Sequence, residues 1–115
     1  MQVSFHPDAR LELLEAAQYY NARLFGLGEI FLEEIEKTVR KLCEAPSRPP
    51  VDLLQRRKWR LRRFPYSVIY KIDGGRVIIL AVAHASRRPG YWDTRTPEGF
   101  EERAAATVQN PSPAR

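Results

Sequence analysis

The spacing of hydrophobic residues changes halfway along this chain. Up to Leu42 they recur every three or four positions, as in helices that bury one face. From Lys58 onward they alternate with polar residues, which is typical of half-buried strands. Pro46, Pro49 and Pro50 lie between the two regions and end the helical pattern, because proline cannot continue a helix. This order predicts an α+β fold in which a helical hairpin packs on a small sheet.

The first half predicts a short strand followed by two helices. Residues 1–5 alternate between apolar and polar, and Pro7 suits the first turn of a helix, where its missing N–H costs no hydrogen bond. His6 beside it is interpreted as a local cap of that helix. Gly26 and Gly28 interrupt the helical spacing, so we expect them in the turn between two antiparallel helices.

The second half predicts three strands. The first contains Trp59 and Leu61, the second runs over 66–72 and the third over 77–83. Because the third is apolar throughout, we expect it in the centre of the sheet, covered on both faces. The Asp-Gly-Gly sequence at 73–75 favours a hairpin turn, since glycine accepts the positive φ that such turns need. With the N-terminal strand, this predicts a mainly antiparallel sheet of three to four strands.

Length and composition restrict the class of protein. A chain of 115 residues suits one domain, which we expect over residues 1–96, followed by a flexible tail at 97–115. Cys43 is the only cysteine, which excludes a disulfide framework, and two histidines with one cysteine give no zinc-ligand cluster. The longest apolar run is too short to span a bilayer, and the N-terminus shows no secretory signal. We therefore expect a cytoplasmic protein without a metal or another cofactor.

Positive charge is concentrated in the second half of the sequence. The net charge is −3 over residues 1–45, +9 over residues 46–97 and −1 over residues 98–115. Such a field attracts phosphate groups or an acidic protein surface. The alternative is a solvated sheet edge that is protected by charge.

The densest part of this charge is a predicted strand with six cations in eight positions. They are Arg56, Arg57, Lys58, Arg60, Arg62 and Arg63. Alternation would send Lys58, Arg60 and Arg62 to one face with a spacing of about 7 Å, close to that of successive phosphates. Trp59 and Leu61 between them are assigned to the core rather than to stacking on nucleic-acid bases.

A second group of polar and aromatic residues follows the predicted central strand, at 84–92. Histidine exchanges protons near neutral pH, so His84 is a candidate base. The alternative is a histidine that caps a turn or is hydrogen-bonded within the sheet. Tyr91 is a candidate proton donor, or else it anchors the C-terminal segment on the core together with Trp92.

These residues permit RNA cleavage without a metal, although composition alone does not select that reaction. The reaction needs a base for the 2′-hydroxyl, cations for the charged intermediate and an acid for the leaving oxygen. The candidates are Lys58, Arg60, Arg87 and Arg88 for the charge, and His84 or Tyr91 for the proton transfers.

Five motifs in this order resemble the RelE/ParE superfamily of type II toxin–antitoxin toxins, also called plasmid stabilisation proteins. They are Phe5-His6-Pro7-Asp8-Ala9, Glu15-Ala16-Ala17-x-Tyr19-Tyr20, Gly26-Leu27-Gly28-x-x-Phe31-Leu32, Arg63-Phe64-Pro65-Tyr66-x-Val68-Ile69-Tyr70 and Ala81-Val82-Ala83-His84-x-x-Arg87-Arg88-Pro89-Gly90-Tyr91-Trp92. The resemblance covers roughly residues 1–95 and implies a helical hairpin on a small antiparallel sheet. It also implies a toxin held inactive by a small antitoxin, with operator DNA bound only through the antitoxin complex.

Two branches of the superfamily imply different targets. RelE-like toxins cleave mRNA in the ribosome, whereas ParE-like toxins inhibit DNA gyrase without cutting nucleic acid. In the RelE-like case, the catalytic residues would be Lys58, Arg60, His84, Arg87 and Tyr91. The resemblance places an arginine directly after Tyr66, where this chain has Ser67, and the sequence of residues 64–66 leans toward the ParE-like branch. We therefore expect a gyrase inhibitor. The alternatives are a ribosome-dependent endoribonuclease and an inactive module that binds only antitoxin and operator DNA.

Two surfaces are expected to bind partners. The residues expected to contact a target or nucleic acid are Arg56, Arg57, Arg62, Arg63 and Arg88. The apolar surface of the hairpin exceeds what a small core needs, so we expect the antitoxin to bind there. The residues assigned to it are Tyr19, Tyr20, Phe25 and Phe31.

Overall fold

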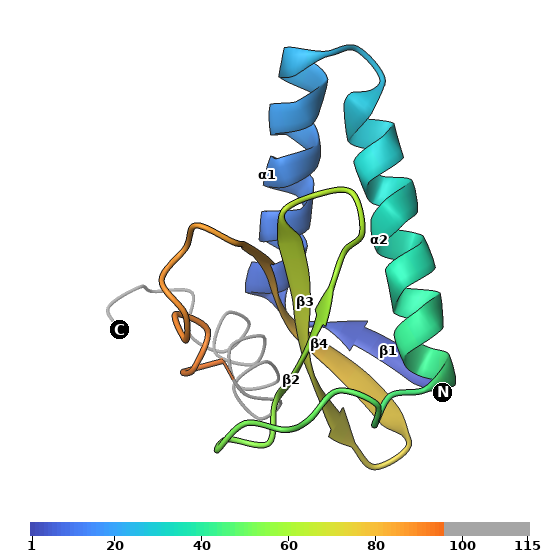
Figure 1. Ribbon diagram of the computed structural model, residues 1–115, viewed down its shortest axis with the longest axis vertical. Coiled ribbons are helices and arrows are strands. Elements are labelled where there is room, and N and C mark those ends of the chain that lie inside the picture. The colour runs from blue at the N-terminus through green and yellow to red at the C-terminus, as the bar shows by residue number, and fades with distance from the viewer. Residues whose placement is uncertain (96–115) are drawn as a thin grey trace, which may run out of the picture.

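The computed structural model describes residues 1–95, which form an α+β domain (Figure 1). Its elements are, in chain order, β1 (Gln2–Phe5), α1 (Pro7–Arg23), α2 (Leu27–Glu44), β2 (Arg57–Arg60), β3 (Tyr66–Asp73) and β4 (Arg76–His84). One strand, two helices and three further strands confirm the order predicted from the hydrophobic spacing. The tail expected at 97–115 lies outside the described residues.

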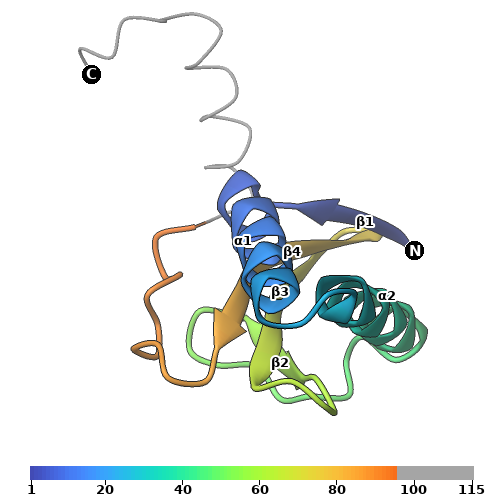
Figure 2. The same ribbon diagram turned by 90° about the horizontal axis from the view of Figure 1, so that it is seen from above.

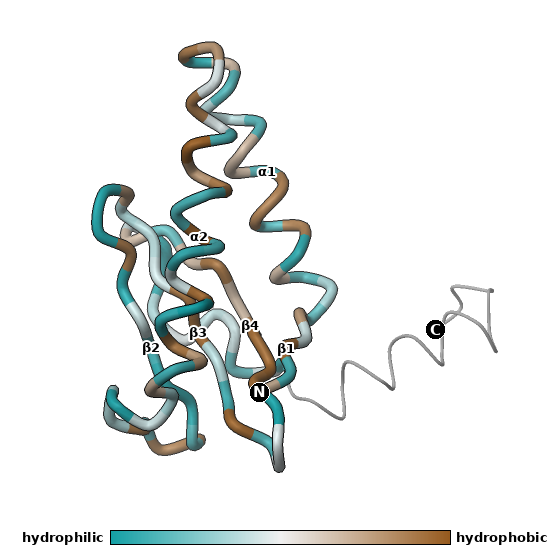
Figure 3. Tube along the Cα trace, turned by 90° about the vertical axis from the view of Figure 1, so that its right-hand side faces the viewer, coloured by the Kyte–Doolittle hydropathy of each residue, from teal (hydrophilic) through white to brown (hydrophobic). Residues whose placement is uncertain are grey.

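The four strands form one mixed sheet in the order β1-β4-β3-β2. β1 runs parallel to β4, with Val3 opposite Val77, while the β4–β3 and β3–β2 pairs are antiparallel. β4 lies inside the sheet, and every residue from Val77 to Ala83 is buried. Figure 3 shows the hydrophobic colouring that follows β4. This strand is apolar at each position because both of its faces are covered, as predicted.

The two helices form an antiparallel hairpin. α2 lies over one face of the sheet, here called the helix face, while α1 packs against α2 and β4 (Figure 2). His6 Nδ1 accepts a hydrogen bond from the backbone N–H of Asp8, so His6 caps α1 as predicted. Gly26 has a φ of 88° in the turn between the helices. Gly28 approaches α1 so closely that a Cβ atom there would overlap the carbonyl oxygen of Ala17.

The helix face carries the main hydrophobic core. Tyr70 and Phe31 are its largest fully buried side chains. Phe31 belongs to an aromatic cluster in which ring centroids lie 4.9 to 6.2 Å apart. The cluster consists of Tyr20, Phe31, Phe64 and Tyr66. It joins both helices to β3 and to the turn before it.

The opposite face of the sheet, here called the second face, is covered by residues 85–95 (Figure 2). Tyr91 and Trp92 pack there against Ile69, Ala81 and Ala83. The two aromatic residues therefore anchor this segment on the sheet, which is one of the two roles considered for them.

Neither helix among residues 1–95 is long and apolar enough to cross a bilayer. In the same part of the chain, no group of three or more His, Cys, Asp or Glu side chains is placed to hold a metal ion.

Candidate functional site

The first part of the candidate site lies on the second face, at the sheet edge formed by β2. Lys58 is paired with Ile69 and Arg60 with Ser67, so both basic residues share a face with Ile69. They border a cavity of about 410 Å³, which Trp92 and the loop before β2 also line. Arg60, at the end of the strand, borders a groove near α2 as well.

His84, Arg87 and Tyr91 border a different cavity of about 350 Å³, between α1 and the end of β4. The ring of His84 packs edge-on against Tyr66, with centroids 5.0 Å apart. Its Nδ1 accepts a hydrogen bond of 2.9 Å from the backbone N–H of Ser86. A neutral imidazole has one acceptor nitrogen, so the acceptor of His84 is already in use. The histidine caps a turn and would have to give up this bond to act as a base.

Two arginines hold the ring of Tyr91. The guanidinium carbons of Arg87 and Arg95 lie 4.1 and 5.2 Å from its centroid. The Tyr91 hydroxyl is buried and makes no hydrogen bond of normal geometry with residues 1–95. Burial raises the pKa of Tyr91 well above the usual value for a phenol, and the nearby carboxylate of Glu12 raises it further. Tyr91 is therefore a weak proton donor at neutral pH.

The two groups of candidate catalytic residues border different cavities, and His84 and Arg60 point to opposite faces of the sheet. His84 is paired with Tyr66, and Arg60 is paired with Ser67, the next residue along β3. Successive residues of a strand point to opposite faces, so His84 points to the helix face and Arg60 to the second face. The structure thus brings His84, Arg87 and Tyr91 together and separates them from the cavity beside Lys58.

Arg56 holds the domain together rather than offering its charge to a target. It is 5% exposed, and its Nη2 donates hydrogen bonds of 3.0 and 2.8 Å to the carbonyl oxygens of Asp93 and Arg95. Arg57 is half-buried and donates to the carbonyl oxygens of Ser47 and Pro49. This burial among backbone carbonyls argues against the predicted role of Arg56 in target binding.

The other predicted target-binding arginines, Arg62, Arg63 and Arg88, are exposed. β2 ends at Arg60, so Arg62 does not extend the basic face of the strand as expected. It lies in the turn before β3, where the N–H groups of Arg62 and Arg63 donate to the carboxylate of Glu34 at 2.9 and 3.3 Å. Arg63 Nε also donates to Glu34 at 3.1 Å. Burial alone would raise the pKa of Glu34, but these hydrogen bonds outweigh burial and lower it.

Sequence analysis did not identify a pairing between Glu12 of α1 and Arg95. Arg95 Nη2 lies 2.9 Å from Glu12 Oε2, and Arg95 Nη1 donates to the carbonyl oxygen of Leu80 at 2.9 Å. Glu12 Oε1 also accepts a hydrogen bond from the N–H of Val82. The pairing of β1 with β4 ends at Ile79, so Glu12 takes the place of a strand partner at Val82. In the sequence, Glu12 has the spacing of an ordinary solvated helix residue, so no local signal distinguishes it.

The four predicted antitoxin-binding residues do not form one surface. Phe25 is 98% exposed at the tip of the hairpin, and Tyr19 is 52% exposed on α1. Tyr20 is half-buried in the aromatic cluster, and Phe31 is completely buried there. The expectation of an accessible Phe31 is therefore wrong, because the ring fills the core. Exposed apolar residues of the hairpin that the sequence analysis missed are Leu11, Leu14, Leu24 and Ile30.

Comparison with known families agrees with this architecture. The sequence model of the family described as "ParE toxin of type II toxin-antitoxin system, parDE" matches residues 3–89. This chain belongs to the ParE toxin family. The match extends from β1 through β4, and it ends before Tyr91 and Arg95.

A solved structure from a ParDE system has the same fold. A chain of the "Chromosomal ParDE TA system from P. aeruginosa" superposes with a TM-score of 0.67 and 18% sequence identity. The similarity covers 75% of this chain and 97% of that chain. At this identity it concerns the fold alone, and no curated protein sequence gave a significant match. Membership of the ParE toxin family implies an antitoxin as a partner.

Proposed function

We propose that this ParE-family toxin inhibits DNA gyrase in the cytoplasm and that a cognate antitoxin neutralises it. The observation that carries the choice of target is the separation of Lys58 from His84 and Tyr91. A ribonuclease of the kind considered above needs a base, an acid and cations around one phosphate. In this fold those groups border two different cavities.

The chemistry of the individual groups is a second argument against a ribonuclease. The acceptor nitrogen of His84 is already hydrogen-bonded to Ser86. Tyr91 has a raised pKa and a buried hydroxyl, which oppose proton donation. Ser67 stands where the RelE-like pattern would have a guanidinium group, and a hydroxyl cannot replace its charge. Inhibition by binding requires none of these groups to react.

For the antitoxin, we propose a binding surface on the outer side of the hairpin. Leu11 and Leu14 are 55% and 48% exposed on α1, and Leu24 and Phe25 are 63% and 98% exposed at the hairpin tip. Exposed apolar groups on one element mark a surface for a partner protein. The basic edge at β2 would in addition attract an acidic segment of the antitoxin.

The target is tested with purified toxin in two reactions run side by side. We expect the toxin to reduce the supercoiling of relaxed plasmid by gyrase in a concentration-dependent manner, and to leave mRNA intact in a reconstituted translation reaction. Adding antitoxin in excess should restore supercoiling. In cells, DNA synthesis should fall before protein synthesis when both are pulse-labelled after induction.

The same reactions identify the alternatives. Cleavage of mRNA that disappears in both Lys58→Ala and Tyr91→Phe would establish the ribonuclease and refute the gyrase proposal. If supercoiling and mRNA are both unaffected while the antitoxin still binds, the chain is a module that binds only antitoxin and operator DNA.

The antitoxin surface is tested with two matched pairs of exposed residues. Leu24→Ser/Phe25→Ser should weaken antitoxin binding by about 10-fold or more in a calorimetric titration, if these side chains anchor the partner. Leu53 and Leu54 are 99% and 48% exposed in the loop before β2 and serve as the control pair. If Leu53→Ser/Leu54→Ser weakens binding as much as the hairpin pair does, the proposed surface is wrong.

A further inference from the structure

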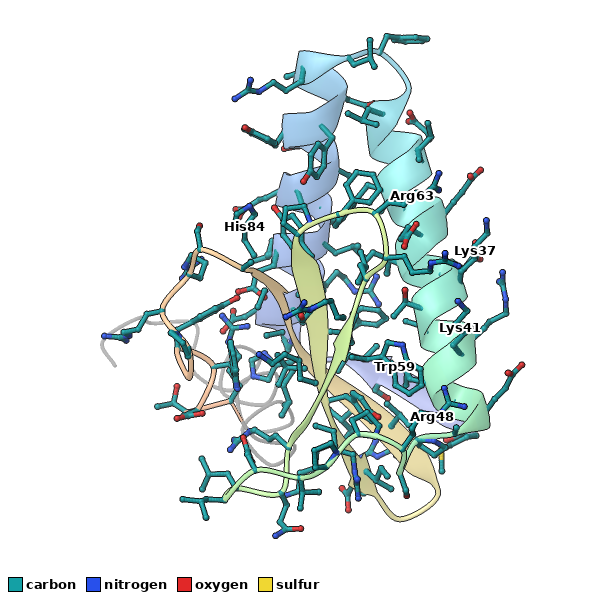
Figure 4. The ribbon with its side chains drawn as sticks, viewed as in Figure 1. Lys37, Lys41, Arg48, Trp59, Arg63 and His84 are labelled. Atoms are coloured by element: carbon teal, nitrogen blue, oxygen red, sulfur yellow. The ribbon has the colours of Figure 1, made fainter. Side chains whose placement is uncertain are left out.

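A groove between α2 and β2 is lined almost entirely by polar residues and has a volume of about 350 Å³. Its lining residues are Glu34, Lys37, Thr38, Lys41, Trp59, Arg60, Arg62 and Arg63. We call it the basic groove. Figure 4 shows Arg63, Lys37, Lys41, Trp59 and Arg48 in succession along it, from the turn before β3 to the loop after α2.

Among residues 1–95, Glu34 is the one carboxylate that lines the basic groove, and its oxygens already accept hydrogen bonds. Glu34 accepts hydrogen bonds from Arg63 Nε and from the N–H groups of Arg62 and Arg63, and its side chain is only 8% exposed. None of the ion pairs formed within residues 1–95 includes Lys37 or Lys41. Lys37 and Lys41 therefore make no close ion pair with a described carboxylate, and their ammonium groups are available to a ligand.

These cations lie on both walls of the groove. Lys37 and Lys41 are one turn apart on α2, a spacing of about 5–6 Å between Cβ atoms. Arg62 lies on the opposite wall, in the turn that follows β2. At the lower end Arg48 lies over the ring of Trp59, with its guanidinium carbon 5.3 Å from the ring centroid. An elongated ligand would thus meet positive charge on both sides.

The lining also distinguishes between two kinds of acidic ligand. A peptide usually gains its affinity from apolar side chains that fill apolar pockets. Trp59 is the one large hydrophobic residue lining the basic groove, and its ring already contacts Arg48. The cavity between the helices and β1, in contrast, has Phe5, Leu13 and further aliphatic residues in its walls. The basic groove suits a ligand that binds through its charges alone.

We propose that the basic groove binds the phosphodiester backbone of nucleic acid without regard to base sequence. Lysine ammonium groups act as point charges for phosphate, and arginine guanidinium groups make paired hydrogen bonds to it. This property goes beyond the proposed inhibition of gyrase and does not depend on it, because it is measured without gyrase.

The test is the fluorescence anisotropy of labelled 20-mer DNA, single-stranded and duplex, with the full chain at 50 to 200 mM salt. Each phosphate contact adds about 0.9 to the slope of log K against log salt for duplex and about 0.7 for a single strand. Four contacts would lower the affinity for duplex by roughly 10²-fold across this range. Equal affinity for scrambled sequences is expected.

Removing two cations from the groove gives the decisive comparison. Lys37→Gln/Lys41→Gln should reduce the duplex slope by about 1.8 units, because two contacts are lost. Arg10→Gln/Arg40→Gln removes the same charge from exposed positions outside the groove and should leave most of the slope intact. All four positions are exposed and helical, and glutamine is a good helix former, so thermal unfolding should change little. The control pair should lose slightly more stability, because the guanidinium carbon of Arg10 lies 5.2 Å from the centroid of the Phe5 ring.

Three results would overturn the proposal. One is the absence of DNA binding at 50 mM salt. Another is a slope that the control pair lowers as much as Lys37→Gln/Lys41→Gln does. The third is displacement of the DNA by polyglutamate at equal charge concentration, since that would assign the groove to an acidic protein segment instead.

Discussion

The two faces of the sheet are held by different kinds of interaction. On the helix face, rings and aliphatic side chains from both helices and all four strands form one continuous core. On the second face, only Ile69, Ala81 and Ala83 form a buried cluster, and Tyr91 and Trp92 cover it. The segment that carries these two rings is fixed by hydrogen bonds from Arg56 and Arg95 to backbone carbonyls.

This difference shows how a small domain with one pair of helices can cover both faces of its sheet. Apolar packing tolerates small shifts, because its free energy depends mainly on buried area. A buried guanidinium group depends on each of its partners, because a missing one leaves a charge without compensation. The stability of the helix face should therefore depend on its large apolar side chains, whereas that of the second face should depend on a few polar atoms.

The largest expected effect comes from the helix face. Phe31→Ala removes a fully buried ring from the aromatic cluster and should lower the free energy of unfolding by about 3–5 kcal/mol in a urea titration. Phe25→Ala removes the same ring from a 98% exposed position and should change it by less than about 0.5 kcal/mol. Equal losses in the two variants would contradict the assigned core.

The second-largest effect is expected for the Glu12–Arg95 pair, which fixes residues 85–95 on the second face. Arg95 has a 14% exposed side chain and pairs with Glu12 at 2.9 Å and with Asp8 at 3.7 Å. Glu12→Gln removes the nearer of these two carboxylates and should destabilise the domain by about 2–3 kcal/mol. Glu15→Gln makes the same change at an exposed position of α1 and should cost less than about 0.5 kcal/mol.

A double-mutant cycle separates the pairing from other effects of the substitution. In the background of Arg95→Met, Glu12→Gln should lose most of its cost, because no buried cation remains to be compensated. A cost that is unchanged in that background would show that Glu12 acts mainly through the N–H of Val82.

Sequence patterns predicted the helix face well because its interactions are periodic. The spacing up to Leu42 and the apolar run at 77–83 identify the elements without any long-range information. The hydrophobic residues that recur at these spacings are those that the core buries. Phe31 was assigned to a surface because periodicity identifies an apolar face, but not how completely a partner element in the same chain covers it.

The polar contacts that fix residues 85–95 on the second face could not be predicted from residue spacing. Glu12 and Arg95 are 83 positions apart, and Arg56 and Arg95 are 39 apart. Neither pairing follows from helical or strand spacing. The six cations at 56–63 look equivalent in the sequence, yet Arg56 is buried, Arg63 binds Glu34 and Lys58 is exposed. Contacts with distant parts of the chain decide which of them is available to a partner: residues 93–95 bury Arg56, and Glu34 of α2 binds Arg63.

Glu34 tests how the turn between β2 and β3 is fixed to the helix face. Glu34→Gln should cost about 1–2 kcal/mol at pH 7, because it weakens the charge-assisted hydrogen bonds from Arg62 and Arg63. The pKa of Glu34 is lowered in the folded protein. The contribution of ionised Glu34 to stability is therefore complete above about pH 4.3, the usual pKa of glutamate. It is lost as the pH falls through the lowered pKa of Glu34 in the folded protein.

Urea titrations of the wild type and of Glu34→Gln from pH 7 to pH 2.5 measure this dependence. The difference between the two proteins should stay constant down to about pH 4.3 and then shrink. Glu33→Gln on the exposed side of α2 is the control and should show a small difference at every pH. A difference that grows in acid would contradict the lowered pKa.

Two tyrosines with buried hydroxyl groups, one on each face, should give the smallest effects and compare the two faces directly. On the helix face, the hydroxyl of Tyr70 donates a hydrogen bond of 2.7 Å to the carbonyl oxygen of Pro46. On the second face, the Tyr91 hydroxyl is buried beside Glu12 and makes no hydrogen bond of normal geometry with residues 1–95. Tyr70→Phe should therefore cost about 1 kcal/mol, and Tyr91→Phe should change the free energy of unfolding by less than about 0.5 kcal/mol.

An alkaline absorbance titration then checks the Tyr91 substitution independently. Burial raises the pKa of Tyr91, so Tyr91→Phe should remove a phenol that ionises far above pH 10, while the tyrosines that ionise first remain. A raised pKa stabilises the protonated fold below pH 10, and this contribution disappears as the pH rises through the folded value. If Tyr91→Phe instead removes a phenol that ionises near pH 10, the Tyr91 hydroxyl reaches solvent, and its rejection as a proton donor loses its basis.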